Sequence, residues 1–135
     1  MQKGADMYQE MLVNYGMEEA EYSVQQKTLL IQFHADVDHH NAGSIRTKAD
    51  RLIARGGLKN IVFDFEGVHF MDSSGIGMIM GRYKQVVFQG GKIAACGVGS
   101  EVDRILTMSG LYRVMEKYEC ARDAVEALNQ KRGGR

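Results

Sequence analysis

The chain has 135 residues, of which 44% are hydrophobic, so it is long enough for one domain with a buried core and too short for two. Lysine and arginine total 17, as do aspartate and glutamate, so no basic excess points to a nucleic acid or an anionic membrane as a partner. The N-terminus lacks the pattern of a signal peptide and the apolar runs are short, so we expect a cytoplasmic protein without a membrane span.

Residues 1–20 are predicted to form an N-terminal extension with a short amphipathic helix, which Asp6 can cap and Gly16 can end. Such a helix needs apolar surface from elsewhere to be stable, either from the domain itself or from a second copy or a partner. The apolar residues on its shared face are Tyr8, Met11, Leu12 and Tyr15.

The next elements are predicted to be a β-hairpin and a helix. "AEYSVQQ" and "KTLLIQFHA" alternate as two strands joined at Gln26 and Lys27, with Tyr22 and Val24 facing inward. A helix follows, with Asn41 available as its N-cap and glycines 56 and 57 as its stop. Its apolar positions are Ala42, Ile45, Ala49, Leu52 and Ile53.

The rest of the chain alternates between strand and helix patterns. "NIVFDF", "KIAACGV" and "RVMEKY" are predicted strands, and the first is apolar enough to be covered on both faces. Gly90 and Gly110 end the two helices between them. The apolar positions of the three later helices are Ile76, Ile79, Met80, Tyr83, Val86 and Val87, then Val102, Ile105 and Leu106, then Ala121, Ala124, Val125 and Leu128.

This order of elements predicts an α/β fold for residues 21–130, followed by a polar C-terminal tail at residues 131–135. We expect a small mixed sheet, mostly parallel, with helices mainly on one face. Cys96 and Cys120 are expected to be small buried hydrophobic residues, because two distant cysteines in a reducing compartment form neither a metal knuckle nor a stable disulfide.

The stretch "HFMDSSGIGMIMGRYKQ", residues 69–85, places two serines where a strand pattern gives way to a helix pattern. A serine hydrolase would combine one of the serines with Asp38 and a histidine of "DVDHH". The nucleophile elbow, however, has glycine two residues on either side of the serine, and Ser74 has Asp72 and Ile76 at those places. We therefore do not expect a hydrolase.

Metal and phosphate-loop chemistry are also disfavoured. His39 and His40 are adjacent and generally point in different directions, and no further ligand lies at a recognisable spacing, so no metal is expected. "GIGMIMG" lacks the Gly-Lys-Ser/Thr ending of a phosphate-binding loop. Gly75, Gly77 and Gly81 instead fall within the predicted helix, where they allow close approach of the sheet or of a partner.

The N-terminus of this helix offers a simpler role for Asp72, Ser73 and Ser74, since a serine there can accept hydrogen bonds from free backbone N–H groups. One cap requires one hydroxyl, and two serines with an acid exceed that need. The partial positive charge of a helix start would tolerate a phosphate, which changes the surface charge by about −1.5 to −2. A phosphorylation switch is therefore compatible with the fold.

Three motifs, "DVDHHNA", "FMDSSGIGMIMGRYKQ" and "LTMSGLYRVMEKYE", resemble the STAS domain of bacterial anti-sigma factor antagonists, most closely the sporulation type, over about Glu21 to Leu128. The resemblance implies a five-stranded α/β domain without catalytic activity or cofactor. In that family the anti-sigma factor, an ATP-dependent serine kinase, phosphorylates the antagonist. The unphosphorylated form binds the anti-sigma factor and frees the sigma factor, and a serine phosphatase resets the switch.

Carried over to this chain, the resemblance implies Ser74 as the phosphoacceptor and leaves Ser73 as a turn and capping residue. Asp72, two residues before the acceptor, could orient the hydroxyl or the kinase's magnesium, or cap the helix. The family's usual Gly-Glu-Leu-Asp is replaced here by Ala-Asp-Val-Asp at residues 35–38, which removes the flexible glycine. A STAS module that binds a nucleotide or small anion at the same helix N-terminus, without phosphate exchange, remains the alternative, and a stress-response circuit remains open. The expected partner-binding residues are Asp38, His39, His40, Asp72, Ser73, Ser74, Gly75 and Gly77.

Overall fold

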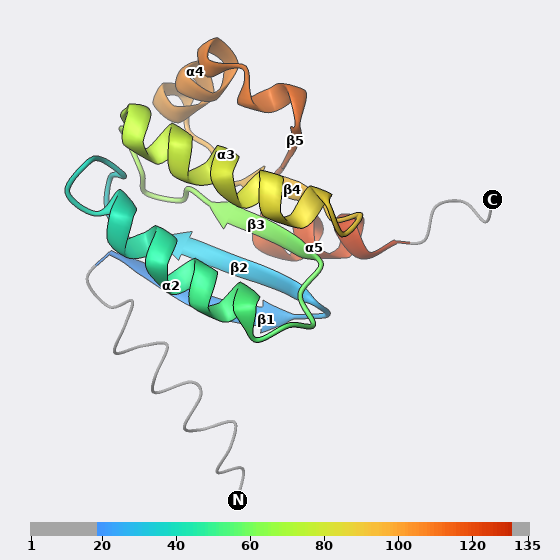
Figure 1. The fold of residues 1–135 in the computed structure, drawn as a ribbon. Helices are drawn as coiled ribbons and strands as arrows, with labels where there is room; N and C mark the ends of the chain where they lie inside the picture. Colours follow the sequence, from blue (N-terminus) through green and yellow to red (C-terminus); the bar gives the residue numbers. More distant parts are fainter. Residues whose placement is uncertain (1–18, 131–135) are drawn as a thin grey trace, which may run out of the picture.

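A five-stranded sheet with helices on both faces makes up residues 19–130, the part of the chain that the computed structural model describes (Figure 1). The helix expected within residues 1–20 and the tail at 131–135 lie outside the described residues, apart from Glu19 and Ala20. The strands are β1 (Ala20–Gln25), β2 (Thr28–Phe33), β3 (Asn60–Asp64), β4 (Ile93–Cys96) and β5 (Met115–Tyr118). The helices are α2 (Ala42–Ala54), α3 (Ser73–Val87), α4 (Ser100–Ser109), the short 3-10 helix η1 (Leu111–Arg113) and α5 (Ala121–Asn129).

The strands lie in sequence order, β1-β2-β3-β4-β5. β1 is antiparallel to β2, and the other pairs are parallel, so the predicted mixed and mostly parallel sheet is confirmed. Because β2, β3 and β4 run in one direction, the loops that follow them meet at one edge of the sheet. The "DVDHH" loop after β2 and the "DSSG" turn after β3 therefore become neighbours.

The β1–β2 hairpin turns at Gln26 and Lys27, as predicted, with φ angles of +49° and +65°. A two-residue turn with both residues in the left-handed region matches the twist of the flanking strands. Tyr22 is 1% exposed, whereas Val24 is 40% exposed, so the expectation that both face a covered interior is wrong for Val24. Val24 lies at the turn end of an edge strand, where packing from neighbouring elements runs out.

Helices cover the two faces of the sheet unequally, as expected. α2, α3 and α4 pack on one face, where Ile61 and Phe63 of β3 are fully buried. α5 alone covers the other face, over Leu30, Val62 and Ala94. β3 is thus buried on both sides, which explains its nearly continuous apolar sequence. Full burial of each large side chain contributes about 1.5–3 kcal/mol.

A buried arginine joins the two helices that carry the site. Arg82 of α3 is 6% exposed, and its Nε lies 3.1 Å from Oδ1 of Asp50 on α2. Burial lowers the pKa of Arg82, and the facing carboxylate opposes that shift. The apolar pattern of α3 did not predict this position. The residues that α3 buries are Gly75, Met78, Ile79, Arg82 and Val86.

The two cysteines differ in environment. Cys96 is buried in β4, and burial, together with the nearby Asp64, raises the pKa of its thiol to about 12. Cys120 is exposed, so the expectation that it is buried is wrong, because it precedes α5 in a loop at the sheet edge. Within residues 19–130, no helix combines the length and apolar character that crossing a membrane requires.

One glycine between α3 and β4 is expected to be required by the packing. A Cβ atom at Gly91 would collide with the backbone carbonyl oxygen of Lys59, so Gly91→Ala should lower the free energy of unfolding by about 1–3 kcal/mol. Gly81 in α3 has no atom within 4 Å of such a Cβ, and the matched control Gly81→Ala should raise stability by up to about 1 kcal/mol. Urea denaturation measures both, and equal stabilities would contradict this packing.

Candidate functional site

Asp72 is the N-cap of α3. Its backbone is extended, with φ −98° and ψ −172°, and its Oδ1 accepts hydrogen bonds from the N–H groups of Ser74 at 2.8 Å and Gly75 at 3.4 Å. The expectation that Ser73 caps this helix is therefore wrong. Ser73 is the first helical residue, and a cap needs the non-helical backbone that residue 72 has.

The second oxygen of Asp72 reaches the loop after β2. Oδ2 accepts a hydrogen bond from the N–H of His39 at 3.0 Å and lies 3.4 Å from Nδ1 of the same histidine. Desolvation alone would raise the pKa of Asp72, but the hydrogen bonds from Ser74 and His39 outweigh it and lower that pKa below its usual range. One ionised carboxylate thus joins the "DVDHH" loop to the start of α3.

A second acid joins the same two loops. Oδ1 of Asp36 accepts hydrogen bonds from the N–H groups of His69 at 2.8 Å and Phe70 at 3.1 Å, which lie 33 and 34 residues away in the chain. The backbones also pair directly, through Val37 N–H to Phe70 C=O at 3.2 Å and Asp72 N–H to Val37 C=O at 3.1 Å. The loops after β2 and β3 are therefore one hydrogen-bonded unit.

The histidines occupy the exposed rim of this unit. Their side chains are 69% exposed for His39 and 77% for His40, and their ring centroids are 4.0 Å apart. Asp38 turns the loop: its Oδ1 accepts the N–H of His40 at 2.9 Å, and this bond is the main reason that its pKa is lowered. Asn41 stands at the N-cap position of α2 as expected, but its side chain accepts the N–H of Asp38 instead of capping the helix.

Both serines are free to react. Ser73 is exposed and Ser74 is half-buried, and neither hydroxyl forms a hydrogen bond to another group within residues 19–130. The contact between serine and histidine that a hydrolase needs is thus missing from the described residues. The same residues contain no group of three or more His, Cys, Asp and Glu arranged to hold a metal ion.

The glycines after the serines differ in their surroundings. A Cβ atom at Gly75 would collide with the Met71 side chain and come within 2.9 Å of Cγ1 of Val37, so the predicted close approach is confirmed there. Gly77 and Gly81 have no atom within 4 Å of such a Cβ, so the prediction that they allow close approach of the sheet is wrong. Gly77 is exposed, and close approach of a partner to it stays a prediction.

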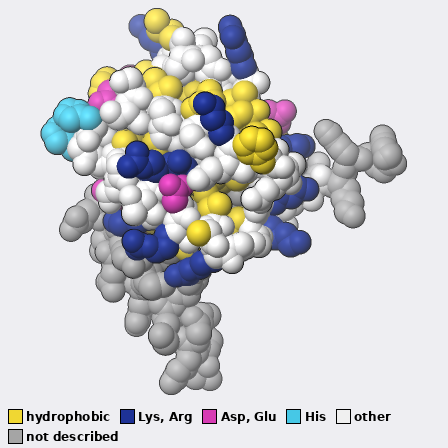
Figure 2. Space-filling model, in the orientation of Figure 1, with side chains coloured by type: hydrophobic (Ala, Val, Ile, Leu, Met, Phe, Trp, Pro, Cys, Tyr) yellow, Lys and Arg dark blue, Asp and Glu magenta, His cyan; other side chains and the backbone are white. Residues whose placement is uncertain are grey.

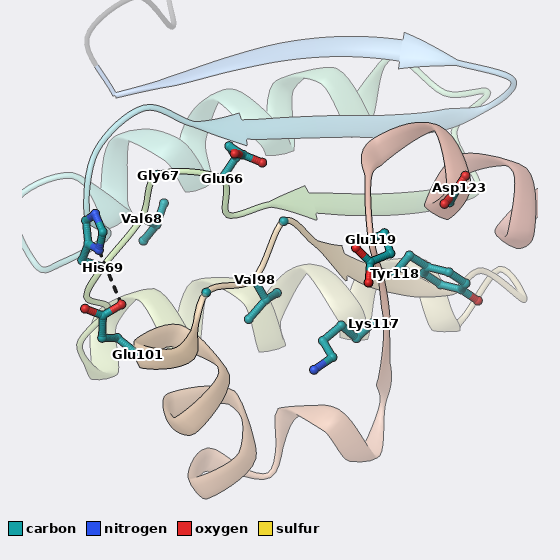
Figure 3. A pocket seen from close by; sticks show the side chains of 12 residues that line it. Glu66, Gly67, Val68, His69, Val98, Glu101, Lys117, Tyr118, Glu119 and Asp123 are labelled. Atoms are coloured by element: carbon teal, nitrogen blue, oxygen red, sulfur yellow. Dashed lines mark hydrogen bonds and ion pairs between the residues drawn. The ribbon is translucent and has the colours of Figure 1, made fainter.

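A separate crevice of about 680 Å³ opens at the ends of β3, β4 and β5, where α/β sheets usually bind ligands (Figure 3). Its cationic side chain is Lys117, and His69 is paired with Glu101 at 3.5 Å. Neither serine lines it. The acid excess opposes binding of a nucleotide or other anion there. The carboxylates that line this crevice are Glu66, Glu101, Glu119 and Asp123.

The surface around the site carries both polar and apolar side chains (Figure 2). Figure 2 shows histidine side chains gathered at one edge of the face formed by α2 and α3, while lysines and arginines are spread over the rest of that face. The expected site residues of the loop before α2 and of the start of α3 lie at the same edge of the sheet. The structure brings together Asp38, His39, His40, Asp72, Ser73, Ser74 and Gly75.

Comparison with known proteins assigns the fold. The STAS domain model matches residues 19–127, so the chain belongs to the STAS domain family, and the resemblance of its motifs is confirmed. It is 38% identical over 102 residues to an anti-sigma F factor antagonist of Paenibacillus polymyxa, which covers 76% of this chain and 85% of that protein. It is 31% identical over 88 residues to an anti-sigma F factor antagonist of Lysinibacillus sphaericus, covering 65% of this chain and 75% of that protein.

The fold also resembles a solved structure of the Bacillus cell fate determinant SpoIIAA in its phosphorylated form. The TM-score is 0.66 at 26% identity, and the match covers 82% of this chain and 99% of that one. Asp36 and Phe70 were not singled out as site residues in the sequence. Their contacts join loops more than 30 residues apart, which residue spacing alone does not reveal.

Removal of the Asp72 carboxylate should destabilise the protein in a pH-dependent way. Because its folded-state pKa is lowered, the stabilisation is present above the unfolded value of about 4 and is lost as the pH falls through the folded value. Asp72→Ala should lower the melting temperature by about 3–6 °C at pH 7. The difference from the unaltered chain should shrink as the pH falls below about 4, while the part that comes from the capping oxygen remains.

Two variants control this measurement by calorimetry. Asp72→Asn keeps a capping oxygen without the charge and should retain most of the stability at pH 7. Ser73→Ala removes a hydroxyl that caps nothing and should leave the melting temperature unchanged at every pH. A loss in Asp72→Ala that is the same at pH 3 and pH 7 would show that the charge does not contribute.

Proposed function

We propose that this chain is an anti-sigma factor antagonist of the sporulation type. Its unphosphorylated form binds an anti-sigma factor that is also an ATP-dependent serine kinase, and so releases a sigma factor. The 38% and 31% identical relatives, both named as anti-sigma F factor antagonists, support this function. The observation that carries it is that Asp72 joins the backbone of Ser74, whose hydroxyl is unbonded, to the backbone of His39 in the "DVDHH" loop.

Ser74 is the proposed phosphoacceptor. It matches the family's acceptor in "DSSG", and Asp72 fixes its backbone N–H while leaving its hydroxyl unbonded. The kinase transfers the γ-phosphoryl group of ATP to Oγ of Ser74, with ADP as the leaving group and the hydroxyl proton passing to a base of the kinase. A serine phosphatase restores the hydroxyl by hydrolysis. This chain itself acts as a substrate and a binding partner, not as an enzyme.

Electrostatics explains why the modification should prevent binding. A phosphoryl group adds a charge of about −1.5 to −2 at Ser74, next to the ionised Asp72. Two of the helix N–H groups that could stabilise it, those of Ser74 and Gly75, already donate to Asp72, so the helix start is a less favourable place for an anion than the sequence predicted. Burying the unpaired dianion in a protein interface costs on the order of several kcal/mol of binding free energy.

The remaining predicted contacts with the kinase lie around Ser74. His39 and His40 are exposed, and Asp38 and Asp72 fix their backbone positions, so they can contact a partner without rearrangement. Ser73 is exposed, and Gly77 has no side chain to obstruct an approaching surface. The alternative, a module that binds a nucleotide or small anion, gains no support from a helix start occupied by Asp72 or from the acidic crevice.

Phosphorylation of single-serine variants tests this function. After incubation with the anti-sigma factor kinase of the same organism and labelled ATP, Ser73→Ala should take up label and Ser74→Ala should not. Mass spectrometry should place the phosphate on Ser74 in the unaltered chain. Ser74→Ala should stay bound to the kinase in the presence of ATP. Ser74→Asp should bind the kinase at least about tenfold more weakly than the unaltered chain.

Two results would contradict the assignment. Label retained by Ser74→Ala, or lost only from Ser73→Ala, would exclude Ser74 as the acceptor. No binding of the unaltered chain to the kinase, in the presence or absence of nucleotide, would exclude the function itself.

A further inference from the structure

An exposed apolar band lies beside the serine site. It consists of the exposed Phe70 and Met108 with the half-buried Ile105, and we call it the Phe70–Met108 band. Phe70 is 51% exposed and Met108 is 79% exposed. Phe70 and Ile105 line one groove of about 510 Å³ between the loop after β3 and α4. Ile105 and Met108 are three residues apart on α4, so they share a face of that helix.

Phe70 is held rigidly although its ring is half exposed. Its N–H donates to Oδ1 of Asp36 at 3.1 Å, and its carbonyl accepts the N–H of Val37 at 3.2 Å. Both backbone polar groups are therefore fixed by the same loop that carries the histidines. A pre-positioned aromatic side chain loses little conformational freedom on binding, and such residues are frequent energetic anchors of protein interfaces.

The serine site alone does not supply such an anchor. Its exposed side chains are Ser73, His39 and His40, which are polar, whereas a specific interface usually buries about 800 Å² on each partner around an apolar centre. Five large hydrophobic side chains are exposed within residues 19–130. Phe70 precedes Ser74 by only four residues, while Phe88 follows α3 and lies about 20 Å away along that helix.

We propose that the Phe70–Met108 band is a docking surface for the anti-sigma factor kinase and that it receives an apolar side chain of the kinase when Ser74 approaches the active site. This inference rests on the function proposed above and extends its partner surface from α3 to α4. The band and the serine turn share one edge of the sheet, so a protein that contacts Ser74 covers both.

The charge beside the band indicates what the kinase should present. Arg104 lines the groove with Phe70 and Ile105, is exposed, and forms no ion pair with any residue between 19 and 130. The neighbouring Glu101 is already near His69, at 3.5 Å. A carboxylate next to the apolar side chain of the kinase would pair with Arg104 and set the register of docking.

The test compares two exposed phenylalanines. Phe70→Ala and Met108→Ala should each raise the Kd for the purified anti-sigma factor kinase of the same organism about tenfold. Phe88→Ala, which removes an 89% exposed ring at the other end of α3, should leave Kd within about twofold. Phe70→Leu should restore most of the affinity. In phosphorylation assays, Phe70→Ala should raise the KM for this chain and leave kcat unchanged, because the serine turn is intact.

The outcomes separate this surface from the proposed function. Absence of binding by the unaltered chain would overturn the function and the surface together. Normal binding that Phe70→Ala and Met108→Ala leave within about twofold would overturn the surface alone. If Phe70→Ala abolished self-association of the chain, the band would bind a second copy. If deletion of residues 1–18 tightened kinase binding and Phe70→Ala had the same effect, the band would bind that segment. Either result would also overturn the proposal. Unchanged melting temperatures exclude misfolding of the variants.

Discussion

The carboxylate of Asp72 accepts hydrogen bonds on both oxygens, and the geometry of the site depends on this pair of contacts. One oxygen caps α3, and the other holds the backbone of His39 in the loop after β2. The parallel strands bring these segments to the same edge of the sheet, but proximity alone would leave two independent loops. Asp36 adds a second link by holding the backbone before the "DSSG" turn. Together, the two acids make one rigid surface from segments far apart in sequence.

The same carboxylate would give the proposed phosphorylation switch its direction. Before modification, its single negative charge is shared among N–H groups of His39, Ser74 and Gly75. A phosphoryl group on Ser74 would add like charge where those donors are already used, so the change falls on the partner-facing surface. The fold does not depend on the modified atom, because the Ser74 hydroxyl bonds to nothing within residues 19–130. Stability and regulation are therefore separable at this residue.

The sequence predicted the elements better than the contacts between them. Periodicity and turn chemistry placed every strand and α-helix between residues 20 and 130, including the Gln26–Lys27 turn and the glycine stop at Gly110, but not the short 3-10 helix η1. It left Asp72 and Ser73 both as possible caps and assigned the cap to Ser73, since capping depends on backbone angles that neighbouring polar residues do not distinguish. The Asp36 contacts and the buried Arg82–Asp50 pair depend on tertiary packing, which a single sequence does not encode in its spacing.

The central claim is that one edge of the sheet, centred on Asp72, is the surface that binds the kinase only when Ser74 is unmodified. Nuclear magnetic resonance of the isotope-labelled chain, titrated with the kinase, tests this residue by residue. The account predicts perturbed amides at residues 36–40, 70–77 and 104–108, and no perturbation once Ser74 carries phosphate. Perturbations confined to the acidic crevice at Glu66, Glu119 and Asp123, or unchanged by phosphorylation, would contradict it.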